Sequence, residues 1–201
     1  MARSFFVDEV LARYVAEHST PPDPVQQDLI AETAAATGDH HRMQIGADQG
    51  TFLSILTAAL RPRLAVEVGT FTGYSALAVA RALPPGGRLI CCDVSEEWTA
   101  IARRHWERAG VADRIDLRLG PAAETLAALP DDVPIDLAFV DADKTGYLDY
   151  YEALVPRLAD TGVLLVDNVL WGGRVLPTSD ADDPDTSALR AFNDHVAADP
   201  R

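Results

Sequence analysis

Between residues 64 and 166, the chain alternates short, uninterrupted apolar runs with longer segments of helical periodicity. The apolar runs predict strands at Leu64–Val68, Arg88–Cys92, Ile115–Leu119, Ile135–Val140 and Gly162–Val166. Helices are expected between them, at about Tyr74–Leu83, Glu96–Ala109, Ala122–Leu129 and Tyr147–Leu158. Continuously apolar strands are typical of a parallel sheet that is buried on both faces, and βαβ units connect such strands. The alternation therefore predicts an α/β fold, a mostly parallel central sheet with helices on both faces.

Helices are also expected on either side of this core. Periodicity and turn residues predict three of them before it, over about 5–18, 24–37 and 48–60, the third with Asp48 as its N-cap. We therefore expect residues 1–60 to form a helical cap on a core of residues 61–201, together a single domain. The Asp-rich segment Thr178–Ser187 is expected to be a surface connector or a lid, followed by a last helix at Ala188–Ala198.

Polar side chains follow two of the expected strands at the points where they end. Asp141 comes directly after the fourth strand, and Asp167 and Asn168 come directly after the fifth. The carboxyl ends of parallel strands meet at the edge where open α/β sheets bind ligands, so these oxygens are expected to converge there, with the ammonium of Lys144 alongside. An all-oxygen set suits Mg²⁺, which we favour, or Mn²⁺ or Ca²⁺. The alternative is that each Asp only caps the helix that follows its strand.

A glycine-containing turn follows the first strand. Gly69 and Gly73 allow the backbone to turn tightly, and the next helix begins near Ser75, where free N–H groups can bind an anion. The Gly-x-x-x-Gly spacing differs from the Gly-x-Gly-x-x-Gly of dinucleotide sites and disfavours a nicotinamide-dependent oxidoreductase. Asp93, at the end of the second strand, is suited to accept hydrogen bonds from a ribose. A nucleoside-like cofactor such as S-adenosylmethionine fits this combination; the plain alternative is a turn without a ligand.

Five segments together resemble a known family. They are Glu67-Val-Gly-Thr-Phe-Thr-Gly-Tyr-Ser, Cys92-Asp-Val-Ser, Ala109-Gly-Val-Ala, Phe139-Val-Asp-Ala-Asp-Lys and Asp167-Asn-Val-Leu-Trp-Gly-Gly. The chain resembles the cation-dependent, caffeoyl-CoA-type O-methyltransferases and, more distantly, catechol O-methyltransferase. The resemblance covers about Met43 to Gly173, with the motifs in order and at the family's spacing, and it implies a Rossmann-like class I methyltransferase fold.

The resemblance also implies roles for individual residues. Asp141, Asp167 and Asn168 would hold the metal. Lys144 would act at the catalytic centre with Asp141, and Trp171 would wall the acceptor pocket or simply belong to the core. The S-adenosylmethionine pocket would be lined by Met43, Ile45, Glu67, Gly69, Ser75, Asp93, Ala122, Asp141 and Asp143. The family often has a hydroxyl residue where this chain has Ile45, and it usually continues beyond the position of Arg201 with an edge hairpin. The hairpin is missing from this sequence, so we expect truncation or an open sheet edge.

The expected reaction is metal-dependent transfer of a methyl group from S-adenosylmethionine to a hydroxyl of a catechol-like or hydroxycinnamoyl-type small molecule. The alternatives are a tRNA-hydroxyl methyltransferase of the same family and an inactive S-adenosylmethionine-binding or scaffold protein. The net charge of −14, from 17 basic and 31 acidic residues, makes nucleic acid an unfavourable partner. The complete set Asp141, Lys144, Asp167 and Asn168 argues against an inactive protein.

Location and assembly are expected from weaker features. No apolar run approaches the roughly 18 residues of a membrane span, and the amino terminus lacks the pattern of a signal peptide. The only cysteines, Cys91 and Cys92, are adjacent in one expected strand and are not expected to form a disulfide with each other. We therefore expect a cytoplasmic protein, and the family resemblance suggests a homodimer.

Overall fold

The computed structural model describes residues 8–130, 132–179 and 182–201. Its strands are β1 (Leu64–Val68), β2 (Arg88–Asp93), β3 (Ile115–Leu119), β4 (Ile135–Val140) and β5 (Leu158–Val166). They form one sheet in the order β3-β2-β1-β4-β5, and each neighbouring pair is parallel. The predicted α/β fold with a mostly parallel sheet is confirmed. β1 lies at the centre, where the strand order reverses, so ligands are expected beyond its carboxyl end.

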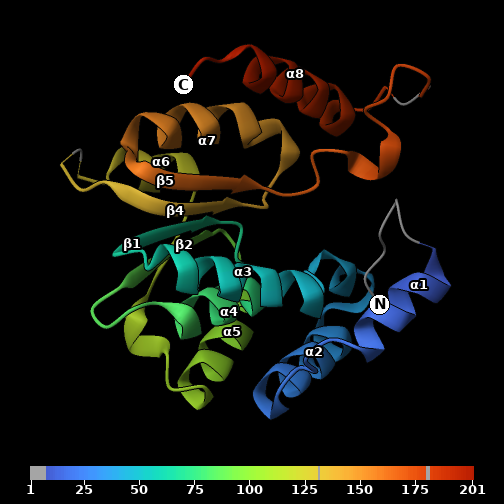
Figure 1. Ribbon diagram of the computed structural model, residues 1–201, viewed down its shortest axis with the longest axis vertical. Coiled ribbons are helices and arrows are strands. Elements are labelled where there is room, and N and C mark those ends of the chain that lie inside the picture. Colours follow the sequence, from blue (N-terminus) through green and yellow to red (C-terminus); the bar gives the residue numbers. More distant parts are fainter. Residues whose placement is uncertain (1–7, 131, 180–181) are drawn as a thin grey trace.

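Helices cover both faces of the sheet (Figure 1). The α-helices are α1 (Glu9–Glu17), α2 (Pro24–Thr37), α3 (Ala47–Leu60), α4 (Tyr74–Ala82), α5 (Glu96–Arg108), α6 (Ala122–Ala127), α7 (Tyr147–Leu154) and α8 (Pro184–Ala198). Short 3₁₀ turns lie at Gly38–Met43, Ala112–Arg114, Lys144–Gly146, Val155–Arg157 and Trp171–Gly173. Figure 1 shows α2 to α5 on one side of the sheet and α6 to α8 on the other.

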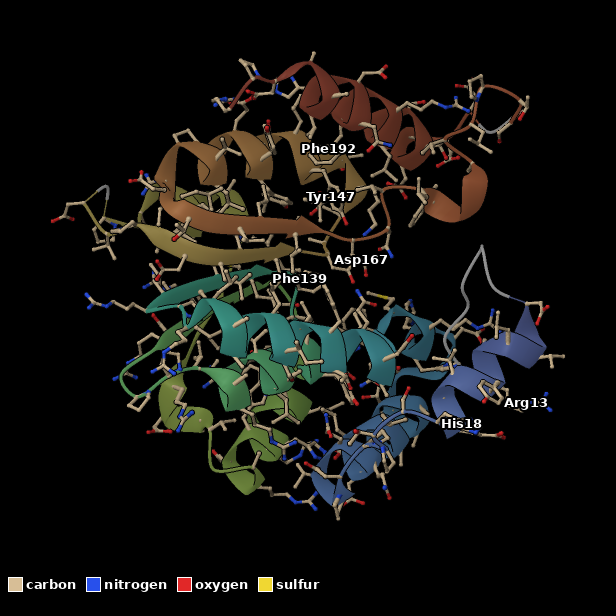
Figure 2. All side chains as sticks on the ribbon, viewed as in Figure 1. Arg13, His18, Phe139, Tyr147, Asp167 and Phe192 are labelled. Carbon is tan, nitrogen blue, oxygen red and sulfur yellow. The ribbon has the colours of Figure 1, made fainter. Side chains whose placement is uncertain are left out.

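Each face of the sheet has its own apolar core. Leu53 of α3 and Leu77 of α4 pack with the inward side chains of β1 and β2 on one face. On the other face Tyr147 of α7 and Phe192 of α8 pack in a second cluster, with their rings edge to face at a centroid distance of 5.6 Å. Figure 2 shows Phe139 of β4 on the opposite side of the sheet from this pair. The central strands β1, β2 and β4 are thus buried on both faces, as continuous apolar strands predict, whereas the edge strands β3 and β5 are only partly buried.

The helices before β1 do not all pack in the same way. α2 packs on α4 and α5, and α3 packs on α4, so both belong to the layer that covers one face. In α1, by contrast, Val10 and Tyr14 are mostly exposed. The residues of the expected first helix before Asp8 lie outside the described part of the chain. Within that part, no helix combines the length and the apolar character needed to cross a bilayer.

Two predicted details at helix starts are wrong. α3 is capped by Gly46, and Asp48 lies within its first turn, where a carboxylate stabilises the helix dipole without capping it. α8 begins at Pro184, four residues earlier than expected, because the side chain of Asp183 caps it and Pro suits the first helical position. The expected loop Thr178–Ser187 is therefore shorter, and its residues 180 and 181 lie outside the described ranges.

The junction of α7 and β5 also differs from the prediction. The helix expected to reach Leu158 ends at Leu154 and passes into the 3₁₀ turn Val155–Arg157, because Pro156 lacks the N–H group that would continue the α-helical hydrogen bonds. β5 then starts at Leu158 instead of Gly162, and its pairing with β4 shifts between Ile135 and Leu137. The carboxyl end of β5, which carries Asp167, lies where the sequence predicted it.

Candidate active site

Asp141 and Asp167 lie side by side at the carboxyl edge of the sheet. The N–H of Asp141 donates to the carbonyl of Val68 at 2.8 Å, and the N–H of Asp167 donates to the carbonyl of Val140 at 2.9 Å. Parallel pairing thus continues one residue past the strand ends and brings the two carboxylates together. Burial raises the pKa of Asp141, and the neighbouring Asp167 adds to this, whereas Lys144 opposes it. Two adjacent carboxylates repel each other, and a bound cation relieves the repulsion.

Asn168 follows directly in a left-handed conformation with φ 60°. The residue is exposed, and it follows Asp167 directly at the same edge of the sheet. This edge therefore offers a cation three oxygen ligands at adjacent strand ends. They come from two carboxylates, Asp141 and Asp167, and one amide, Asn168. This composition fits a hard divalent cation such as Mg²⁺ and does not fit the nitrogen and sulfur sites of zinc.

Lys144 is buried beside the two carboxylates. Its Nζ donates to Asp141 Oδ1 at 3.0 Å and to the hydroxyl of Tyr147 at 2.6 Å. It also lies 4.7 Å from the centroid of the Tyr147 ring and 5.6 Å from that of Trp171. An ammonium has three N–H donors, so one is left to contact a ligand at the sheet edge. The ion pair and the aromatic rings hold a positive charge at this edge.

Trp171 packs in the core and lies close to Lys144. Its side chain packs against the second core cluster, and its indole Nε1 is buried without a hydrogen-bond partner among the described residues. Its backbone adopts φ 45° in the turn after Asn168, so the ring comes over Lys144. The core packing of Trp171 is thus shown, and its role as a wall of the acceptor pocket stays a prediction.

The residues predicted to bind the methyl donor begin at the end of β1. The side chain of Glu67 is almost fully buried, and its Oε2 has no hydrogen-bond partner within the described ranges. Burial raises the pKa of Glu67 to about 8, an effect that the nearby hydroxyl of Ser75 only partly offsets. A buried carboxyl oxygen without a partner is costly, and a ligand with an ammonium group would supply the missing donors. This residue therefore fits the amino group of a bound S-adenosylmethionine.

The glycine turn brings the end of β1 against Asp141. Gly69 has φ 91°, and a Cβ there would stand 2.1 Å from the carbonyl oxygen of Asp141. Asp93, at the end of β2, holds this turn: one of its carboxylate oxygens accepts from the N–H of Thr70 at 2.9 Å and of Phe71 at 2.7 Å. Its other oxygen accepts from Ser95 N–H at 2.8 Å. Three of about four acceptor positions are used, so one remains for a ribose hydroxyl.

The other predicted cofactor residues differ in their burial. Ser75 is buried in the first turn of α4, and Ala122 is buried at the start of α6. Asp143 is exposed and accepts a hydrogen bond from the hydroxyl of Tyr150 at 2.6 Å. Ile45 packs against the first core cluster, whereas Met43 is half exposed.

A hydrogen-bonded group of polar side chains links the Met43–Ile45 segment to the glycine turn. Thr33 Oγ1 of α2 donates to Thr72 Oγ1 at 2.9 Å, and Gln44 Nε2 lies 3.2 Å from the first hydroxyl and 3.4 Å from the second. The segment that carries Met43 and Ile45 is thus adjacent to the glycine turn.

Sequence reasoning missed two residues of the site. Tyr147, which binds Lys144, follows it by three residues, and that helical spacing was an available signal. Gln49 of α3 donates to Asp167 Oδ2 at 2.8 Å from 118 residues away, and no local pattern indicates such a contact.

Comparison with known proteins identifies the family. The O-methyltransferase family profile matches residues 16–201. A caffeoyl-CoA O-methyltransferase from Eucalyptus gunnii is 36% identical over 99% of this chain and 84% of its own length. Tricin synthase 1 from Oryza sativa subsp. japonica is 35% identical, again over 99% of this chain and 84% of its own.

Solved structures give the same result. The O-methyltransferase from Bacillus cereus, in complex with SAH, has a TM-score of 0.86 and 32% identity, covering 96% of this chain and 87% of that one. TomG from Streptomyces achromogenes, in complex with SAM, has a TM-score of 0.84 and 30% identity, covering 93% and 83%. The chain therefore belongs to this O-methyltransferase family of S-adenosylmethionine-dependent enzymes.

Proposed function

We propose that this enzyme transfers the methyl group of S-adenosylmethionine to a hydroxyl of a catechol-like or hydroxycinnamoyl-type small molecule, with the help of a divalent cation. The observation that carries the proposal is the pair Asp141 and Asp167 at adjacent strand ends, with the buried ammonium of Lys144 beside them. The names of the relatives, a caffeoyl-CoA O-methyltransferase and a tricin synthase, support a phenolic acceptor.

Asp141, Asp167 and Asn168 would hold the cation, which is most simply Mg²⁺. When bound, a divalent cation draws a neighbouring phenol toward its phenolate form near neutral pH. Lys144 would then lie against the acceptor oxygen: its remaining N–H donor orients that oxygen, and its charge stabilises the phenolate. Asp141 keeps Lys144 in place by their 3.0 Å ion pair, so its carboxylate would serve both the cation and the Lys144 ammonium.

The donor would lie along the turn after β1. Glu67 would bind its amino group, Asp93 its ribose, and Gly69, Ser75, Ala122, Asp141 and Asp143 would line the remainder, with Met43 and Ile45 closing the pocket. The task of these residues is to hold the acceptor oxygen, the methyl carbon and the sulfur in line, and such orientation can supply several kcal/mol of the barrier.

Methyl transfer to catechol tests this proposal directly. We expect turnover with Mg²⁺, loss of turnover with EDTA, and no turnover with resorcinol, whose hydroxyls are not neighbours and cannot chelate one cation. Asp167→Ala should abolish turnover and leave S-adenosylmethionine binding intact. Turnover that persists in EDTA and in the Asp167→Ala variant would contradict the metal role.

We further propose a cytoplasmic homodimer. The buried, unpaired thiols Cys91 and Cys92 suit a reducing compartment. The exposed apolar residues of α1, Val10, Leu11 and Tyr14, offer a surface for a second copy. Light scattering should give the mass of two chains for the wild type and a lower mass for Leu11→Lys. A wild-type monomer would contradict the proposed assembly.

A further inference from the structure

We infer that Gln49 is a positioning residue, which holds the carboxylate of Asp167 in the orientation that metal binding requires. This inference rests on the proposed function, because it gives Asp167 a cation to bind. Gln49 lies in the first turn of α3, on the helical layer and not on the sheet edge that carries the proposed ligands. It would thus be the link between that layer and the metal site.

Both oxygens of the Asp167 carboxylate already have a hydrogen-bond donor. Oδ2 accepts from Gln49 Nε2 at 2.8 Å, and Oδ1 accepts from the N–H of Asn168 at 2.6 Å. The main-chain carbonyl of Asp167 accepts from the hydroxyl of Tyr147 at 3.0 Å. With one donor on each oxygen the plane of the carboxylate is fixed, and each oxygen keeps a second lone pair for a cation.

The chemistry of the Gln49 side chain suits this role. A carboxylate only accepts hydrogen bonds, so the amide must present its NH₂ group to Asp167 and not its oxygen. A neutral donor adds no charge beside the proposed cation. Lys at this position would repel a cation, and Glu would repel Asp167, whereas an amide orients the ligand and leaves its charge available.

The packing of α3 fixes where Gln49 can reach. The next residue, Gly50, is buried against α4, and a Cβ there would stand 2.8 Å from the Cε1 atom of the Tyr74 ring. The Oγ of Ser54, one turn along α3, donates to the carbonyl of Ala78 at 3.0 Å. α3 is therefore held closely against α4, and its first turn projects the amide toward the end of β5.

Substituting Gln49 by Met tests the inference, because Met keeps the length of the side chain and removes the donor. We would titrate Mn²⁺ into the wild type and the variant by calorimetry, with S-adenosylmethionine present, and titrate S-adenosylmethionine separately in EDTA. Loss of a hydrogen bond to a metal ligand typically weakens metal affinity by about 10-fold to 100-fold. We expect a loss of that size for Mn²⁺ and unchanged affinity for S-adenosylmethionine. Gln27→Met is the matched control, since Gln27 lies on α2, away from the site, and its amide donates to the carbonyl of Pro22 just before that helix.

The outcomes separate the inference from the function on which it rests. Wild-type protein that does not bind Mn²⁺ would overturn both. If the wild type binds Mn²⁺ and Gln49→Met binds it with the same affinity, the role of Gln49 is overturned while the proposed metal site stands. Gln49→Ala repeats the test without a thioether near the carboxylate, and thermal unfolding of each variant shows whether it is folded. Weaker Mn²⁺ binding in both folded variants, with the control unchanged, would support the inference.

Discussion

The Nζ of Lys144 lies 2.6 Å from the hydroxyl oxygen of Tyr147, and this hydroxyl in turn donates to the main-chain carbonyl of Asp167. The contact joins the amine proposed to face the acceptor to the strand end proposed to hold the metal. Burial raises the pKa of Tyr147, so the phenol keeps its proton and remains a donor to Asp167 while it accepts from Lys144.

Removing this hydroxyl should slow the reaction. A hydrogen bond to a charged group contributes about 1.5–3 kcal/mol, so Tyr147→Phe should lower kcat by roughly tenfold or more as Lys144 loses its orientation. Steady-state kinetics with saturating S-adenosylmethionine would measure this. Tyr151→Phe is the control, because its hydroxyl donates to Asp199 at the far end of α8. Equal kcat values for both variants would show that Tyr147 has no part in positioning the amine.

Cofactor binding should release a proton at neutral pH. The pKa of Glu67 is raised to about 8, so its carboxyl carries a proton in the free protein at pH 7, whereas binding an ammonium group favours the carboxylate. Affinity for S-adenosylmethionine should therefore rise with pH up to about 8 and then level off. Calorimetry at pH 7 in two buffers of different ionisation enthalpy would count the protons released. Identical heats in the two buffers would rule out the exchange.

The same group should make the free protein less stable at high pH. Folding raises the pKa of Glu67 above its usual 4.5, so its contribution to stability is present below that value and lost as pH rises through about 8. Glu67→Gln cannot ionise and should be more stable than the wild type at pH 9, by roughly 1–4 kcal/mol. Urea unfolding at pH 5 and pH 9 would test this. A stability difference that does not grow with pH would mean that folding leaves the pKa of Glu67 unchanged.

Substitution of Gly69 should disrupt both the proposed S-adenosylmethionine pocket and the proposed metal site. Gly69→Ala would require a left-handed residue, which costs roughly 1–2 kcal/mol, and would also drive a Cβ into the carbonyl of Asp141. Gly86→Ala is a matched control with φ 80° and no atom within 4 Å of the added Cβ. We expect Gly69→Ala to lower Tm further than Gly86→Ala and to weaken both S-adenosylmethionine and Mn²⁺ binding. A similar Tm for the two variants would argue against the close approach.

The sheet and its carboxyl edge could be predicted because local signals determine them. Strands buried on both faces are mostly apolar, so β1 and β4 were predicted with the bounds that the structure has; β3, a partly exposed edge strand, was also predicted with its observed bounds. The ends of parallel strands share one edge, which is why Asp141 and Asp167 were expected to be adjacent.

The remaining features depend on contacts between distant segments. Gln49 reaches Asp167 only because α3 packs on α4, and the group Thr33, Gln44 and Thr72 forms only once α2 lies over the glycine turn. Neither arrangement leaves a periodic pattern in the sequence. Pro156 predicts the early end of α7, but the apolar residues after Pro156 are also compatible with a longer helix.

The strand order has a consequence for how such an enzyme can diversify. On the proposed assignment, the methyl donor is recognised mainly at the ends of β1 and β2, whereas the acceptor meets β4, β5 and the turn that carries Trp171. The two recognition tasks share the segment after β4, which carries Asp141, Asp143 and Lys144, but otherwise use separate segments. Acceptor preference can therefore be re-engineered by varying residues 169–179 and the start of α8, while the cofactor-binding residues are left unchanged.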